Sequence, residues 1–154
     1  MTHVLAGSYL LSAFVLHVLL TVGEAQQQLP TPVTLHRQAN AAYDRGDYQQ
    51  ARQLWHEALA GYRARADHRG ESAVLNNLGV LYHRLHQYST ALAYYQQALT
   101  LQERVLGREH PDLVPTLEHY AVLLQKMQRH AEADAMQEWA RHIRSRNPPG
   151  RSTQ

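Results

Sequence analysis

Apolar residues recur every three or four positions through most of the chain, most clearly in residues 75–99, LNNLGVLYHRLHQYSTALAYYQQAL. Leu75 and Leu78 share one face of a predicted helix, and Ala91 and Tyr95 share one face of a second helix, because residues three or four apart lie side by side on an α-helix. The polar stretch HRLHQYS between them is long enough to reverse the chain. The pattern therefore predicts an antiparallel helical hairpin.

The same pattern occurs three times. The middle copy uses Leu75, Leu78, Gly79, Tyr82, Ala91, Tyr95 and Ala98. The set recurs 40 residues earlier and 42 residues later, and the leucine stands 16 residues before the first alanine of the second helix in each copy. Self-similarity at such a period indicates stacked helical units. We therefore expect an all-α chain, an α-solenoid of three hairpins at about 33–70, 71–110 and 111–146.

The motif L-x2-L-G-x2-Y, followed by A-x3-Y, resembles the tetratricopeptide repeat (TPR), whose signature is W-x2-L-G-x2-Y and then A-x3-F. The longer period, with LNNL opening one repeat and QERVLGREHPDL linking two, is similar to the repeats of kinesin light chain. The resemblance covers residues 33–145. It implies a non-catalytic scaffold or adaptor that binds a protein or peptide partner on its concave face.

Small and helix-breaking residues complete the expected layout. Gly79 of the first helix and Ala91 of the second are expected to face each other, which lets the two axes approach closely. Gly46 is expected to close the first helix, and Gly70 to lie between the first two hairpins. Ser89 is expected to be the N-cap of the second helix of the middle copy.

Candidate partner-binding residues lie one position beyond the packing stripe of each first helix, a register that lines the binding groove in the family. They are His36, Asn40 and Tyr43, then Asn76, Val80 and His83, then Glu118, Val122 and Gln125, with Arg84 and Lys126 at the groove margin. Asn and Gln suit a peptide ligand because their amides both donate and accept hydrogen bonds.

Two interpretations of the groove margin stay open. Arg84 and Lys126 favour an acidic ligand in one, and are ordinary solvated helix residues in the other. The basic clamp of chaperone-binding relatives is not reproduced, because His36 and Asn76 stand where the family pattern has a lysine. We therefore do not expect the chain to bind a chaperone C-terminus.

Composition suits one globular domain, with 154 residues, 44% of them hydrophobic and a formal net charge of +2. The absence of cysteine excludes disulfides and thiolate metal sites. Eleven histidines suggest a metal site, but His83 and His86 lack a third ligand nearby, and HEALA (56–60) lacks the second histidine of a zinc-protease helix. We expect neither a metal nor another cofactor.

Neither nucleic acid nor catalysis is indicated. Arg141, Arg144, Arg146 and Arg151 cluster near the C-terminus, but cations also stabilise a helix C-terminus through its dipole. Few aromatic residues, on which nucleic-acid bases would stack, lie among these arginines. The chain contains no nucleophile elbow, phosphate-binding loop or dinucleotide fingerprint, so we do not expect an enzyme.

The N-terminus differs from the rest, because residues 4–22 are almost uncharged and strongly apolar. Small residues at Gly23 and Ala25 predict a signal peptide cleaved after Ala25, which would export the chain to a bacterial periplasm or the extracellular space. Alternatively the segment is a membrane anchor, since it approaches the length of a span, or it follows a misassigned start codon. Residues 26–32 are then a linker, and residues 147–154 a disordered tail.

The last helix offers an alternative role. Because no further helix follows it in the predicted layout, Met136, Trp139 and Ile143 are expected to be partly exposed. A second copy of the chain would cover them, which would make the protein a structural subunit that self-associates through this helix. An ordinary frayed end is the competing interpretation.

Overall fold

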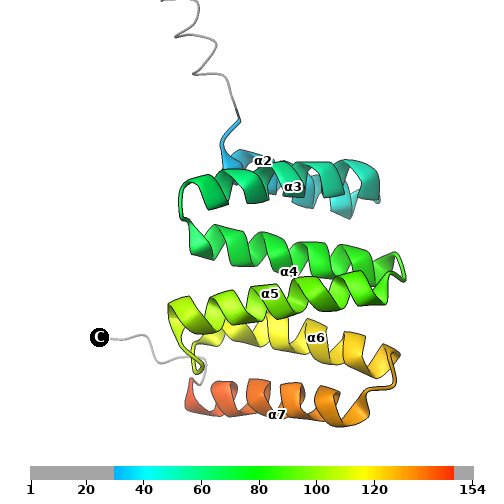
Figure 1. The fold of residues 1–154 in the computed structure, drawn as a ribbon, viewed down its shortest axis with the longest axis vertical. Helices are drawn as coiled ribbons and strands as arrows, with labels where there is room; N and C mark the ends of the chain where they lie inside the picture. The colour runs from blue at the N-terminus through cyan, green and yellow to red at the C-terminus, as the bar shows by residue number, and fades with distance from the viewer. Residues whose placement is uncertain (1–29, 148–154) are drawn as a thin grey trace, which may run out of the picture. The chain divides into compact units, whose positions relative to one another are not determined.

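The computed structural model describes residues 30–147, which form six α-helices and one 3-10 turn (Figure 1). The helices are α2 (Pro32–Asp44), α3 (Tyr48–Ala64), α4 (His68–Arg84), α5 (Tyr88–Leu106), α6 (Val114–Lys126) and α7 (His130–Arg146), with the turn η1 (Pro111–Leu113) before α6. The predicted signal peptide or anchor, most of the predicted linker and nearly all of the predicted tail lie outside the described residues.

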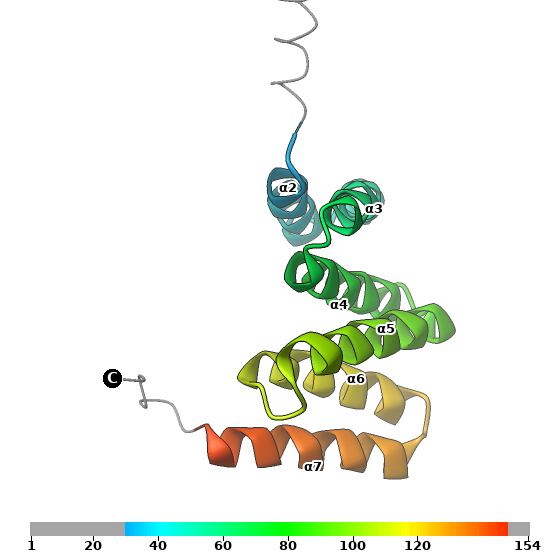
Figure 2. The ribbon, with the colours of Figure 1, turned by 60° about the vertical axis from the view of Figure 1, so that its left-hand side comes forward.

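Consecutive helices pack into three hairpins, α2 with α3, α4 with α5, and α6 with α7. Each hairpin packs on the next, through α3 with α4 and α5 with α6, so the hairpins follow one another in chain order (Figure 1). Figure 2 shows that their direction turns along the stack, because α2 and α3 are seen nearly end-on while α7 is seen lengthwise. The predicted all-α solenoid of three hairpins is confirmed.

The first helices of the hairpins lie closer together than the second helices. Helix α4 has α-carbons within 8 Å of both α2 and α6, whereas no α-carbons of α3 and α5, or of α5 and α7, come that close within residues 30–147. A stack that is tighter on one side curves toward that side. The concave side is therefore the one formed by α2, α4 and α6.

Four of the turns between helices share one backbone conformation. Each has a residue in the left-handed region just past the helix, with φ of 82° at Gly46, 53° at Ala66, 59° at His86 and 60° at Gln128. The next residue then donates its N–H to a carbonyl five positions back, as Asp67 does to Tyr62 at 3.0 Å. This is the Schellman arrangement, which pairs backbone groups left free at a helix C-terminus. The prediction that Gly46 closes the first helix is confirmed.

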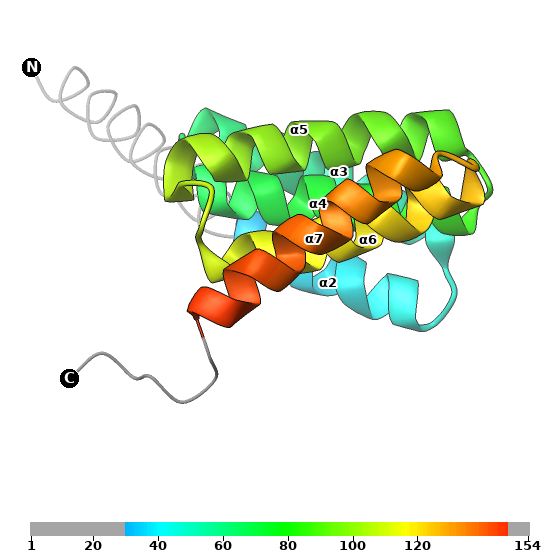
Figure 3. The same cartoon turned by 90° about the horizontal axis from the view of Figure 1, so that it is seen from below.

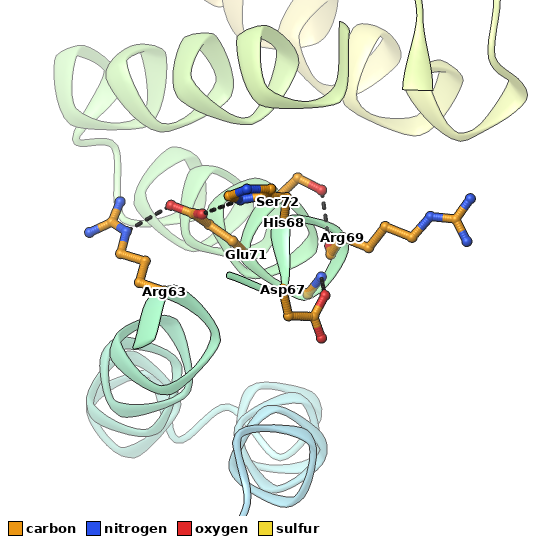
Figure 4. A network of polar contacts seen from close by, with 7 residues as sticks. Arg63, Asp67, His68, Arg69, Glu71 and Ser72 are labelled. Atoms are coloured by element: carbon orange, nitrogen blue, oxygen red, sulfur yellow. Dashed lines mark hydrogen bonds and ion pairs between the residues drawn. The ribbon is translucent and has the colours of Figure 1, made fainter. Parts of the chain in front are cut away.

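Two predicted helix boundaries are wrong. Helix α4 begins at His68, and the side chain of Asp67 accepts the N–H of Gly70 at 2.9 Å, so Gly70 lies in the first turn of α4 (Figure 4). A side chain on Gly70 would overlap the ring of Tyr62, so the glycine serves close packing there rather than chain reversal. Ser89 is the second residue of α5, whose N-cap, Gln87, makes no side-chain capping bond.

An ion-pair network joins the first hairpin to the second near the turn between α3 and α4 (Figure 4). The Arg63 guanidinium of α3 lies 2.7 Å from the Glu71 carboxylate of α4, and His68 lies 3.4 Å from its other oxygen. Burial by itself raises the pKa of Glu71, but hydrogen bonds from Arg63 and His68 outweigh it, so the pKa is lowered. Glu71 is therefore held ionised between two helices.

The small residues predicted at the crossing of the middle hairpin, Gly79 and Ala91, are buried. Their counterparts in the other two copies of the repeat are buried as well, and they are Ala39, Ala51, Ala121 and Ala133. Gly79 lies against the ring of Tyr95, so the nearest bulk across the second hairpin is aromatic rather than the methyl group of Ala91. Large rings fill the space that the small residues leave.

At the C-terminal end of the solenoid α7 is the outermost helix, and the connection between α5 and η1 runs close to its last turns (Figure 3). Ile143 is fully buried, at 0% exposure, so its predicted partial exposure is wrong. Trp139 is half-buried; its indole Nε1 donates to the Arg108 carbonyl at 2.9 Å, and the Arg108 guanidinium lies 4.5 Å from the indole ring centre. The sequence suggested that a second copy of the chain would cover Trp139, but the loop residue Arg108 of the same chain packs on it.

Candidate binding groove

A hollow of about 240 Å³ opens between α2 and α4, the first helices of two successive hairpins. It is lined by Asn40, Tyr43, Asp44, Trp55, Asn77 and Val80. Three of these, Asn40, Tyr43 and Val80, are predicted groove residues, and the structure brings them together around one concavity. Amide, aromatic and aliphatic side chains therefore meet where two repeats join.

A chain of hydrogen bonds crosses this junction. Trp55 Nε1 donates to Asn40 Oδ1 at 3.0 Å, and Asn77 Nδ2 donates to the same oxygen at 3.1 Å. Asn77 Nδ2 also lies 2.9 Å from His36 Nε2. His36 further packs against the edge of the Tyr62 ring, with centroids 6.1 Å apart. The predicted residues His36 and Asn40 are thus linked to α4, but through Asn77, which was not predicted.

The next junction, between α4 and α6, is joined at the corresponding position. His119 Nδ1 lies 3.3 Å from Asn76 Oδ1. Asn77 and His119 occupy the same position in successive copies of the repeat, 42 residues apart. Both stand one place beyond the predicted register, and the paired asparagines of LNNL are the sequence signal that identifies this second row.

Tyrosines surround Arg84 at one end of the groove. Its guanidinium lies 6.0 Å from the ring centre of Tyr43 and 5.6 Å from that of Tyr48, distances typical of cation–π pairs. Tyr43 also packs on Trp55, with centroids 5.6 Å apart. Hydrogen bonding to Tyr43 and then Tyr48 raises the pKa of Arg84. Arg84 is exposed, and the two aromatic rings hold it beside Tyr43, which lines the hollow.

A cationic region lies where α4 faces the end of α6. Burial lowers the pKa of His83, and the positive charges of Lys126, His86 and His119 lower it further. The edge of the His83 ring packs on Tyr88, with centroids 5.7 Å apart. Lys126 is exposed and is the only lysine of the chain. The structure therefore places His83 within electrostatic reach of Lys126.

The third set of predicted residues lies on α6, in three different environments. Glu118 forms an ion pair with Arg144 of α7 at 2.5 Å, which offsets its negative charge. Val122 is 45% exposed, and it borders a hollow of about 420 Å³ between α6 and α7. Gln125 is exposed. The spacing in the sequence correctly predicted that all three lie on one helix, but it did not predict the pairing of Glu118 with Arg144.

The described residues contain no group of three or more histidine, aspartate, glutamate or cysteine side chains arranged to hold a metal ion. Within residues 30–147, none of the helices combines the length and the apolar character needed to cross a bilayer.

The groove offers hydrogen-bonding amides, two valines and positive charge. These groups suit non-covalent binding.

A family model for the tetratricopeptide repeat matches residues 30–104 and 74–146, which together span the described structure. The chain belongs to the tetratricopeptide-repeat family. TPR domains generally mediate interactions between proteins. A comparison with curated proteins gives no match.

Solved structures of similar fold come from kinesin light chain-like TPR proteins. BtubC (BKLC) from P. vanneervenii superposes with a TM-score of 0.69 at 20% identity, over 80% of this chain and 50% of its own. TPR-like repeats of a Podosopora anserina protein assigned as a kinesin light chain superpose with a TM-score of 0.63 at 22% identity, over 77% of this chain and 57% of their own. A variant of the same repeats with one substitution gives 0.64 at 23% identity, over 75% and 56%. This TPR chain thus spans little more than half the length of these proteins.

Proposed function

We propose that this TPR protein is a non-catalytic scaffold or adaptor that binds a protein or peptide partner along the concave face of α2, α4 and α6. The observation that carries the proposal is the hollow between α2 and α4, where Asn40 and Asn77 present amides beside Tyr43 and Val80. Among residues 30–147, no protein group bonds the NH2 group of Asn40 or the carbonyl oxygen of Asn77, so each amide has one end that can bind a ligand. A donor and an acceptor side by side match the two polar groups of a peptide unit.

Positive charge supports an acidic ligand in preference to a basic one. Arg84 and Lys126 are exposed at the groove margin, and His83 lies close enough to Lys126 to have its pKa lowered. The nearby Glu118 is already paired with Arg144. Charge complementarity of this kind steers association and discriminates between partners more than it adds to affinity.

Self-association through the last helix is the alternative role, and the structure gives it less support. Trp139, the largest apolar group of α7, already donates a hydrogen bond to the Arg108 carbonyl and packs under the Arg108 guanidinium. Ile143 is buried within the same chain. Of the three residues expected at such an interface, Met136 and Trp139 are partly exposed.

We propose export across a membrane as the setting for this function, with retention by an N-terminal anchor as the alternative. The support is the apolar segment 4–22 followed by Gly23 and Ala25, which are small enough for signal peptidase. Sequencing the N-terminus of the protein isolated from its native host tests this. A chain that begins near Gln26 supports a cleaved signal peptide.

Selection from a random peptide library displayed on phage tests the binding proposal, with the full chain as bait. Two valines of nearly equal exposure provide matched variants: Val122 of α6 is 45% exposed, and Val105 of α5 is 41% exposed. Val122→Glu adds a negative charge to the proposed groove, which repels an acidic ligand, and Val105→Glu adds the same group to α5, a second helix of a hairpin. Both sites are exposed, so neither change creates a buried charge.

We expect peptides selected by the wild-type chain to lose at least about tenfold in affinity for Val122→Glu, equivalent to about 1.4 kcal/mol, and to keep their affinity for Val105→Glu. Light scattering should give the same mass for all three proteins. Equal losses in both variants, or a loss only in Val105→Glu, would place the binding surface elsewhere.

A further inference from the structure

The hydrogen bonds between the first two repeats have a fixed direction, because one of their members is a donor only. The indole Nε1 of Trp55 carries a hydrogen and accepts nothing, so the Asn40 atom 3.0 Å away must be the carbonyl oxygen. The Asn77 atom 3.1 Å from that oxygen must then be the amide nitrogen. The orientation of both amides follows from Trp55.

The same constraint extends to His36. Its Nε2 lies 2.9 Å from Asn77 Nδ2, an NH2 group that can only donate. Nε2 must therefore accept with its lone pair, and the imidazole is neutral with its hydrogen on Nδ1. A proton added at Nε2 would point a second N–H at the Asn77 amide, and neither amide can rotate to accept it while Trp55 holds Asn40.

The junction between the second and third repeats has the opposite polarity. There His119 Nδ1 faces the oxygen of Asn76 at 3.3 Å, so the ring donates. A protonated imidazole donates from both nitrogens and therefore keeps this bond. Of these two histidine links between first helices, only the one at His36 requires the neutral ring.

We propose that His36 is a proton-operated latch of the groove. Protonation breaks one of the two hydrogen bonds by which Asn77 holds α2 to α4, so the hollow lined by Asn40 and Asn77 is held less firmly in mildly acidic solution. The latch is a property of the chain alone. Its use to control ligand binding rests on the proposed function.

The surroundings of His36 favour the neutral ring. Helix α3 presents the edge of the Tyr62 ring and α4 presents the uncharged Asn77, while α2 itself carries Arg37 next in the chain and Asp44 two turns further on. Burial lowers the pKa of His36, and no charge among the described residues is a cause of that shift. The proton is thus taken up below the ordinary histidine value of 6.5.

The test follows the Trp55 indole N–H by two-dimensional NMR of the ¹⁵N-labelled full chain, titrated from about pH 8 to about pH 5, the range in which histidines titrate. The chain has two tryptophans, so Trp139→Phe assigns the two indole signals. We expect the Trp55 signal to shift with a midpoint below 6.5 that matches the midpoint of the His36 ring signals.

Three variants separate the latch from general pH effects. His36→Gln keeps an acceptor near the Nε2 position and cannot titrate, so the Trp55 signal should stop following pH. His119→Asn keeps a donor near the Nδ1 position, and the signal should behave as in wild type. Asn77→Asp replaces the donor by an acceptor, which should raise the pKa of His36 above 6.5.

A Trp55 signal that still follows pH in His36→Gln would overturn the latch, as would a His36 pKa that stays low in Asn77→Asp. The effect of the latch on ligand binding, which rests on the proposed function, is tested with a peptide selected from the library. Its affinity should fall at least about threefold from pH 7.5 to pH 5.5, across the histidine range, in wild type and not in His36→Gln. Failure of the peptide selection alone would remove the proposed function and leave the latch measurable.

Discussion

The α-carbon of Gly79 in α4 lies against the ring of Tyr95 in α5, so closely that an added Cβ would come 2.6 Å from two ring carbons. Tyr95 is fully buried and cannot move aside without displacing its neighbours. Gly79→Ala should therefore destabilise the fold by about 1–3 kcal/mol through overpacking, although alanine is the better helix former by about 1 kcal/mol. Urea denaturation followed by circular dichroism measures the change.

The attribution to Tyr95 is tested by a double-mutant cycle with Tyr95→Leu, which removes the ring. Gly79→Ala should cost less free energy of unfolding in that background than in wild type, because residues in contact are coupled. Equal costs in both backgrounds would assign the effect to the backbone of α4 instead.

The hydroxyl of Tyr95 is buried without a hydrogen-bond partner among the described residues. Burial also raises the pKa of Tyr95, consistent with its separation from water. An unpaired buried polar group costs about 1–3 kcal/mol, so Tyr95→Phe should stabilise the protein by about 1 kcal/mol. Its free energy of unfolding from the same denaturation measurement provides the check, and a loss of stability would show that the hydroxyl is paired.

The turns give a matched pair of variants with opposite signs. Ala66 has a φ of 53° and Gly46 a φ of 82°, and both occupy the left-handed position of the same kind of turn. An alanine there costs about 1–2 kcal/mol in backbone strain. Ala66→Gly should therefore raise the thermal unfolding midpoint and Gly46→Ala should lower it. Shifts of the same sign in calorimetry would contradict this account of the turns.

The repeats were predictable from the sequence because their signal is periodic. Leucine and alanine spacing defined three hairpins, and small residues at the crossings, such as Gly79, predicted burial. Predictions of helix boundaries from nearby residues were wrong where contacts with another helix decide where a helix begins. Gly70 resembles a helix break, but it lies within α4 because Asp67 caps the helix and the Tyr62 ring leaves no space for a side chain.

The groove was predictable only in part. Register identified the first helices and the row containing Asn40 and Asn76, but superhelical geometry decides which neighbouring row faces the next repeat. Asn77 and His119 belong to that second row. Glu118 illustrates the limit further, since its pairing with Arg144 depends on how α7 packs, which no local pattern encodes.

Four histidines should make the fold less stable in mild acid. Burial is the largest cause that lowers the pKa of each, and they are His36, His56, His83 and His119. The folded chain then binds fewer protons than the unfolded chain below the ordinary value of 6.5, so stability present above 6.5 is lost as the pH falls toward the folded values. Thermal melts between pH 7.5 and pH 5.5 would show a falling midpoint, and a flat or rising midpoint would contradict the direction of these shifts.

The central claim is that a ligand lies along the concave face. It is tested most directly by the side-chain amide NMR signals of Asn40, Asn76 and Asn77 in the ¹⁵N-labelled full chain, recorded with and without a library-selected peptide. The account predicts that these amide signals shift on binding, together with Val80 and Val122 on the same face. Binding that shifts only signals of α3, α5 and α7, and leaves the three asparagine amides unchanged, would contradict it.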